Sequence, residues 1–151
     1  MLSIKIQEND FDPGAIFNSI ALGRKDFGAK VLFTGVVKDF HNLKDIEKLF
    51  IEHYPIMAEK QLKKICEDTF EKWKIMEIHL VHRYGLLKPG DNIVNLVVVS
   101  KGREEALEGA KFIMDYLKSD APFWKKEYYP EGQSWVTQKI KDVEKLIFWE
   151  K

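Results

Sequence analysis

The chain has 151 residues, 45% of them hydrophobic and 13% aromatic, which supplies enough apolar material for a packed core and excludes a disordered chain. Lysine plus arginine and aspartate plus glutamate each number 24, so no global positive charge exists to attract nucleic acid or an anionic membrane. We therefore expect a single domain over residues 1–151, with any anion-binding site built locally.

Cysteine usage and hydropathy indicate the compartment. Cys66 is the sole cysteine and cannot form an intrachain disulfide, and no apolar run approaches the roughly 20 residues of a membrane helix. The opening MLSIKIQEND lacks the basic start and apolar core of a secretory signal. These features predict a cytoplasmic protein with no membrane segment.

The N-terminal segment predicts a strand followed by a short helix. Residues 2–7 alternate and suit an edge strand. Asp12 resembles a helix N-cap, and Pro13 fits the first helical position. The helix is expected to run to about Leu22, with Gly23 as its stop signal.

The next segment predicts two strands and a long helix. Residues 29–37 and 47–54 are rich in β-branched and apolar residues, which predicts two core strands joined by a polar loop at 38–45. From 55 to about 73, apolar side chains recur every three to five residues, as in an amphipathic helix.

The C-terminal half repeats this order. Residues 76–85 and 92–100 are predicted strands, and a second amphipathic helix is expected from 103 to 118. Pro122 marks its end, and the type of the final segment, up to Trp149, stays open. The order of elements predicts an α+β fold, a two-layer sandwich in which helices pack on a mixed or mainly antiparallel sheet.

The histidines and the cysteine give weak signals for chemistry. The four histidines lie in separate contexts, and the closest two, His79 and His82, should point to opposite faces of one strand. Cys66 falls on the apolar side of a helix, where a free cysteine behaves as a small hydrophobe. We expect no metal site and no bound cofactor.

The segment KSDAPFWKKE, residues 118–127, carries three lysines around two aromatics. Lys118 at a helix C-terminus is ordinary favourable pairing with the helix dipole. Alternatively, Lys118 and Lys125, held close together and screened from water by Phe123 and Trp124, would have depressed pKa values suited to proton exchange. The residues alone leave both readings open.

Five segments together resemble a known family, the catalytic (large) subunit of molybdopterin synthase. They are GAKVLFTGVVKD, IEHYPIMAEK, VHRYGLLKPGD, FIMDYLKSDAPFWKKE and PEGQSWV, in that order from residue 28 to residue 136. The resemblance implies an enzyme of molybdenum cofactor biosynthesis, a sulfurtransferase that converts cyclic pyranopterin monophosphate (precursor Z) to molybdopterin. Two dithiolene sulfurs would arrive as a thiocarboxylate on the C-terminal glycine of a small ubiquitin-like carrier subunit, bound to a homodimer within a heterotetramer.

The resemblance also implies roles for individual residues. Lys118 and Lys125 match the family's active-site lysines, and Arg103 matches an arginine that binds the substrate phosphate. Four further matches adjoin or line the substrate pocket: Lys126, Glu127, Met114 and Phe33.

This chain departs from the family pattern at two basic positions. Lys38 stands where many members have arginine, which keeps the charge but loses the bidentate geometry. Gly102 replaces a histidine before Arg103 and could offer only its backbone N–H at the helix start. Lys139 aligns with a basic residue near the pocket in some members.

Helix length constrains how these residues meet. Fifteen steps at roughly 1.5 Å per residue place Arg103 and Lys118 about 22 Å apart on one helix. We therefore expect Arg103 to act in the pocket of a neighbouring subunit.

The alternative to an enzyme is a non-enzymatic adaptor that docks the ubiquitin-like carrier. A nucleic-acid module is disfavoured by the balanced charge.

Overall fold

The computed structural model describes residues 1–41, 43–119, 122–136 and 140–150, and its centre is a four-stranded sheet. The strand order is β1 (Leu2–Gln7), β6 (Ile75–Arg83), β8 (Asn92–Ser100) and β2 (Ala29–Val36). β1 runs parallel to β6, and the other neighbours are antiparallel. The sheet is therefore mixed, with β1 as the predicted edge strand.

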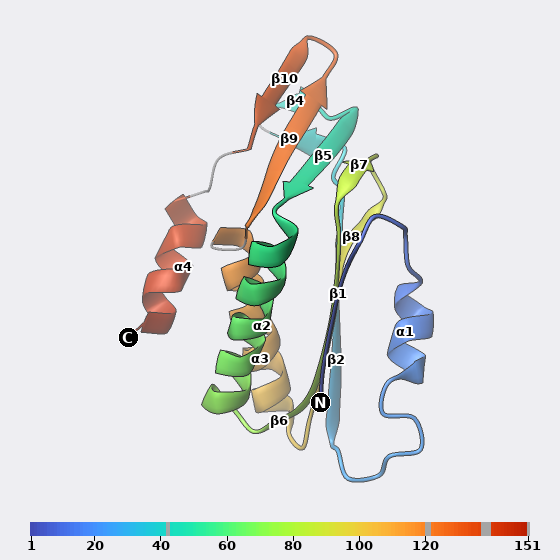
Figure 1. Ribbon diagram of the computed structural model, residues 1–151, viewed down its shortest axis with the longest axis vertical. Helices are drawn as coiled ribbons and strands as arrows, with labels where there is room; N and C mark the ends of the chain where they lie inside the picture. The colour runs from blue at the N-terminus through green and yellow to red at the C-terminus, as the bar shows by residue number, and fades with distance from the viewer. Residues whose placement is uncertain (42, 120–121, 137–139, 151) are drawn as a thin grey trace.

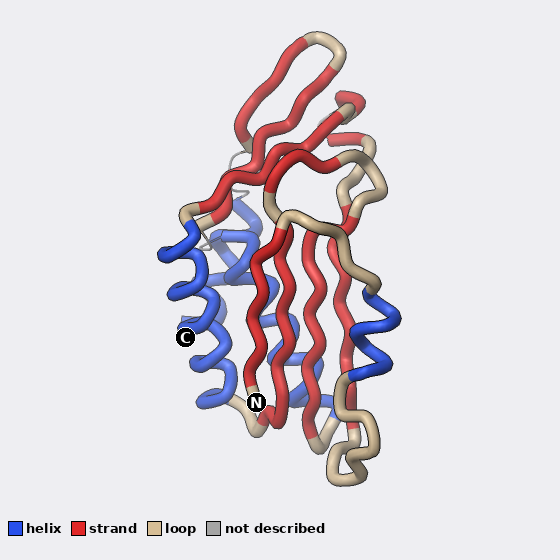
Figure 2. Tube along the Cα trace, turned by 45° about the vertical axis from the view of Figure 1, so that its right-hand side comes forward, coloured by secondary structure: helices blue, strands red, loops and turns tan. Residues whose placement is uncertain are grey.

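Helices cover both faces of this sheet. α2 (Pro55–Lys72) and α3 (Arg103–Ser119) lie side by side on one face, and the short α1 (Pro13–Ser19) lies on the other, as Figures 1 and 2 show. The main core forms between the sheet and the helix pair, where Leu80, Leu96 and Ile113 are almost fully buried. The predicted α+β class is confirmed.

A second sheet lies at one end of the first (Figure 1). Its order is β10 (Gly132–Trp135), β9 (Phe123–Tyr129), β5 (Lys48–His53) and β7 (Gly85–Leu87), all antiparallel. A small hairpin of β3 (Phe40–His41) and β4 (Lys44–Asp45) adjoins it. The prediction of one sheet was thus incomplete, and the segment expected to be a polar loop holds a hairpin.

The two strands expected in the core lie elsewhere. β2 is an edge strand, and its Leu32 and Val36 remain 37% and 46% exposed. β5 belongs to the second sheet, between β9 and β7. The central strands of the main sheet are β6 and β8, whose near-continuous apolar sequences fit burial on both faces.

Local sequence signals act as expected at the start of α1 but not at its end. The Asp12 carboxylate accepts a hydrogen bond from the Ala15 backbone N–H at 3.1 Å, and Pro13 opens α1. The helix ends at Ser19, before the predicted Leu22. The C-terminal segment, left open by the sequence, is α4 (Ile140–Glu150), and its Trp149 indole donates to the buried Asp115 carboxylate at 2.8 Å.

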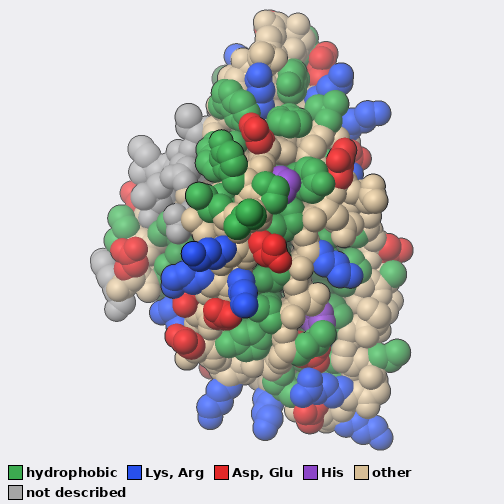
Figure 3. All heavy atoms as spheres, viewed as in Figure 1, with side chains coloured by type: hydrophobic (Ala, Val, Ile, Leu, Met, Phe, Trp, Pro, Cys, Tyr) green, Lys and Arg blue, Asp and Glu red, His purple; other side chains and the backbone are tan. Residues whose placement is uncertain are grey.

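The surface mixes charges of both signs. In Figure 3, basic and acidic side chains intersperse over the helices, and hydrophobic side chains gather over the second sheet, where Trp124 and Trp135 are 43% and 49% exposed. Among the described helices, none combines the length and apolar character needed to cross a membrane.

Candidate active site

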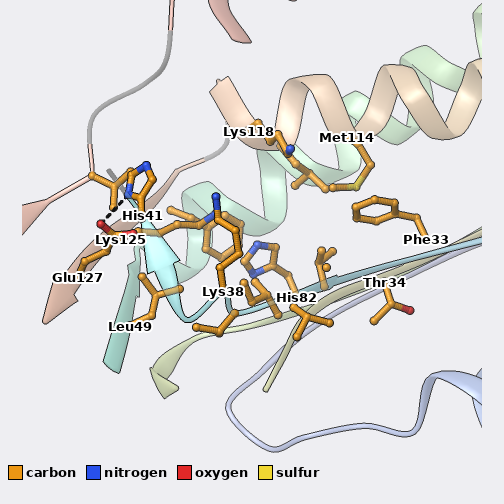
Figure 4. Close-up of a pocket in the computed structure, with 18 of the residues that line it drawn as sticks. Phe33, Thr34, Lys38, His41, Leu49, His82, Met114, Lys118, Lys125 and Glu127 are labelled. Atoms are coloured by element: carbon orange, nitrogen blue, oxygen red, sulfur yellow. Dashed lines mark hydrogen bonds and ion pairs between the residues drawn. The ribbon is translucent and has the colours of Figure 1, made fainter. Parts of the chain in front are cut away.

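A cavity of about 480 Å³ opens where the second sheet meets the main sheet and the C-terminal end of α3. Figure 4 shows its walls: Met114 and Lys118 from α3, Phe33 and Thr34 from β2, and Lys125 and Glu127 from β9. Segments that are more than 80 residues apart in the chain therefore meet around one space. This volume falls within the usual range for small-molecule sites.

Most of the predicted site residues line this cavity. Met114 and Lys118 are one helical turn apart, so both project from the same face of α3. Lys125 and Glu127 are two residues apart on β9 and share its inner face. The predicted residues that meet here are Phe33, Lys38, Met114, Lys118, Lys125 and Glu127.

Other predicted residues lie away from the cavity within one chain. Gly102 and Arg103 stand at the opposite end of α3, which is continuous from Arg103 to Ser119. Lys126 lies on the outer face of β9, with its ammonium 5.4 Å from the Trp135 ring centroid. Lys139 falls outside the described residues.

One side of the cavity is apolar, although not as predicted. Phe123 shares the inner face of β9 with Lys125 and lines the cavity. Trp124 points to the outer face, where it packs edge-on against Tyr54 at 5.0 Å between ring centroids. The alternation of a β-strand separates the two aromatics that the sequence placed together.

His82 is a cavity residue that the sequence did not predict. Its ring stacks on Phe123 with centroids 3.9 Å apart, and its Nδ1–H donates to the Arg83 carbonyl at 2.8 Å. Burial, reinforced by the positive charge of Lys125, lowers the pKa of His82 to about 3. The ring is therefore neutral at physiological pH, and its Nε2 is an acceptor.

His41 also lines the cavity and was not predicted. Its Nδ1 lies 2.8 Å from Oε1 of the buried Glu127 carboxylate. The Tyr129 hydroxyl donates to the same oxygen at 2.6 Å, and this hydrogen bond raises the pKa of Tyr129. His41 belongs to β3 and its partners to β9, so the contact joins the hairpin to the second sheet.

The lining favours an anionic ligand. Three lysines, Lys38, Lys118 and Lys125, surround the cavity, whereas its carboxylate, Glu127, is already hydrogen-bonded to His41 and Tyr129. Among the residues that the structure describes, no three His, Cys, Asp or Glu side chains gather as a metal-binding cluster. Cys66 is buried in the core, and burial raises its pKa to about 12, which makes it a poor nucleophile.

Fold and site together define an α+β protein with a cavity lined by three lysines. The chain matches the family model described as MoaE protein over residues 6–120 and therefore belongs to the MoaE family. A protein from Brucella melitensis named molybdopterin synthase catalytic subunit is 40% identical over 151 residues, covering 99% of this chain and 91% of that protein. The predicted family is confirmed, and so is the prediction that the chain belongs to a family of enzymes.

Solved structures agree with this relationship. A molybdopterin biosynthesis MoaE protein from Burkholderia ambifaria superposes with a TM-score of 0.83 at 38% identity, covering 100% of this chain and 99% of that one. A protein-protein complex of subunits 1 and 2 of molybdopterin-converting factor from Helicobacter pylori gives 0.73 at 21% identity, covering 90% and 91%, which shows a shared fold.

Proposed function

We propose that this chain is the catalytic subunit of a molybdopterin synthase, which inserts two sulfurs into cyclic pyranopterin monophosphate to form the dithiolene of molybdopterin. The observation that carries the proposal is the meeting of Lys118 and Lys125, from α3 and β9, in one cavity with Lys38. Both the phosphorylated substrate and a thiocarboxylate sulfur donor are anions, and three ammonium groups attract both.

Lys118 is the proposed acid/base and tail-positioning residue. It lies at the C-terminal end of α3 on the cavity wall (Figure 4), where the carrier tail is proposed to bind. Lys125 supports it electrostatically, and Lys38 contributes to phosphate binding. An ammonium can donate a proton to the oxygen that leaves as sulfur attacks, which is general acid catalysis.

Arg103 is proposed to enter the cavity of a second copy of this chain. The continuous α3 keeps it at the far end of the helix from Lys118, and its side chain is exposed. A homodimer would bring the guanidinium to the substrate phosphate, for which its planar fork is suited. Gly102 would add only its backbone N–H.

The sulfur donor is proposed to be a small ubiquitin-like carrier with a C-terminal Gly-Gly thiocarboxylate. The Helicobacter pylori protein with this fold is described as a complex of two subunits, which supports a second chain here. Two carriers on a central homodimer would form a heterotetramer. A cytoplasmic location stays a prediction from the sequence.

Reconstitution tests the proposal. The purified chain is combined with thiocarboxylated carrier and cyclic pyranopterin monophosphate, and the dithiolene product is assayed. Lys118→Ala should abolish product without unfolding the protein, whereas Lys63→Ala, a change on the exposed side of α2, should not affect it. Near-normal turnover by Lys118→Ala would refute the assigned role, and carrier binding without any conversion would favour an adaptor instead.

A hybrid dimer tests the shared site. Arg103→Ala and Lys118→Ala chains are each expected to be inactive. Mixed under conditions of subunit exchange, they should recover activity, because one of the two cavities then has both an intact Lys118 and an intact Arg103 from its neighbour. Absence of recovery with both variants folded and exchanged would count against a site built from two chains.

A further inference from the structure

The proposed function includes a hydrolysis step to which no residue has yet been assigned. If sulfur arrives on an acyl carrier and stays on the pterin, the first carbon–sulfur bond leaves the carrier attached to the pterin as a thioester. Water must then add to the acyl carbon, break the acyl–sulfur bond, and give a carrier carboxylate, a pterin thiolate and two protons. A base that takes one proton from the attacking water accelerates this step.

We propose that His41 is that base, with Glu127 and Tyr129 as its positioning residues; this inference rests on the proposed function. His41 lines the cavity beside the lysines, and its side chain is 14% exposed, which leaves it accessible to water in the cavity. The Nδ1 atom is occupied by Glu127, so Nε2 is the ring nitrogen that can exchange a proton with a reactant.

The carboxylate fixes the histidine in a form that can act as a base. An ionised Glu127 can only accept, so the 2.8 Å contact is an Nδ1–H donating to Oε1, which places the lone pair of the neutral ring on Nε2. As a proton arrives at Nε2, the adjacent carboxylate stabilises the imidazolium that forms. A histidine oriented by a carboxylate serves the same purpose in other hydrolytic enzymes.

Tyr129 holds the carboxylate in place. Its hydroxyl donates to Glu127 Oε1 at 2.6 Å and contacts the Ser134 hydroxyl at 3.3 Å, so the network extends from the cavity to β10. The raised pKa of Tyr129 keeps the phenol protonated and therefore able to donate. The charged and titratable groups near this network include Lys38, Lys118, Lys125 and His82 in the cavity lining, Lys44 over the Tyr129 ring at 5.0 Å, and Glu131, whose charge acts on Tyr129.

If His41 had only a structural role, its replacement would have a different effect. The His41–Glu127 contact also ties the β3–β4 hairpin to β9, and a hairpin anchor needs only the hydrogen bond. His41→Asn separates the two roles, because an asparagine amide can donate from near the Nδ1 position but cannot take up a proton. A second histidine–carboxylate pair, His79 with Glu77 at 2.9 Å, lies outside the cavity and supplies the matched control.

The test is a single-turnover reaction with thiocarboxylated carrier and cyclic precursor, quenched and examined by mass spectrometry. His41→Asn should slow hydrolysis of the thioester about 100-fold, which is typical of a lost general base. A covalent carrier–pterin adduct should therefore accumulate. Glu127→Gln should accumulate the same adduct, because the amide no longer favours the required tautomer. His79→Gln, whose amide can donate from near the Nε2 position that contacts Glu77, should form product at the wild-type rate without adduct.

Two failures are distinguishable. If the wild type makes product and His41→Asn and Glu127→Gln do so equally fast with no adduct, the role of His41 is overturned and the proposed function stands. If the wild type makes no product, the proposed function fails and this inference fails with it. Circular dichroism melting of each variant verifies folding, and the Glu127→Gln arm decides the outcome if His41→Asn does not fold.

Discussion

Lowering the pH should destabilise the fold through His82. Burial lowers the pKa of its ring to about 3, whereas an unfolded histidine titrates near 6.5. Below about pH 6.5 the unfolded chain binds a proton that the folded chain does not, so the stability contributed by the neutral ring is full above that pH and decreases towards pH 3. At about 1.4 kcal/mol per pH unit, the change from pH 8 to pH 5 corresponds to a loss of about 2 kcal/mol.

Urea denaturation at pH 8 and pH 5 measures this loss. The comparison is with His82→Asn, which keeps an N–H near the Nδ1 position but does not titrate. The wild type should lose about 2 kcal/mol more than the variant between the two pH values. The endpoint stays at pH 5 so that carboxylates with lowered pKa values, Asp10, Asp26 and Glu77, remain ionised.

Equal pH dependence in the two proteins would refute the reasoning, because it would mean that the folded ring takes up a proton as readily as the unfolded one. Lys125→Met provides an independent check. The positive charge of Lys125 contributes to the low pKa of His82, so its removal should raise that pKa. NMR titration of the His82 ring would detect the change directly.

Three further predictions concern the core and its edges. Gly28→Ala should lower the melting temperature strongly, because a Cβ there would overlap the Lys101 carbonyl oxygen, a backbone atom that cannot move aside. Cys66 should resist a thiol reagent in the native protein and react in urea, given its burial and a pKa of about 12. Trp149→Phe should cost about 1–3 kcal/mol in urea denaturation, because the buried Asp115 carboxylate loses its 2.8 Å donor.

Elements with a clear hydrophobic pattern, such as α3 and β2, were predictable although both line the cavity, whereas β9 was not. The helix predicted at 103–118 is α3, which ends one residue later, at Ser119. It was predictable because most of its apolar side chains, among them Ala106, Ala110 and Ile113, pack into one core. β9 has the sequence FWKKEYY, which does not alternate between polar and apolar residues. Its inner face places Phe123, Lys125 and Glu127 in the lining of the cavity, so polar side chains stand where an ordinary buried strand would have apolar ones.

The same contrast applies to the site residues. Lys118 and Lys125 stand seven residues apart in one segment, so sequence could place them together. His41 gave no signal, because its partner Glu127 is 86 residues away and the two meet only where the β3–β4 hairpin lies against β9. His82 could have been found: it follows Ile78 and Leu80 at alternate positions, so the period of the strand assigns it to the buried face.

The lysines of the cavity and the distant Arg103 differ in both position and chemistry. Within the described residues, the lining of the cavity contains three lysines and no arginine. Lysines are mobile point charges that can exchange protons, whereas arginine remains charged and grips phosphate through two parallel hydrogen bonds. A cavity formed by one chain therefore has groups for proton transfer but lacks the best phosphate ligand, which α3 carries at its other end as the exposed Arg103. This division is what a substrate site completed by a second copy of the chain would require.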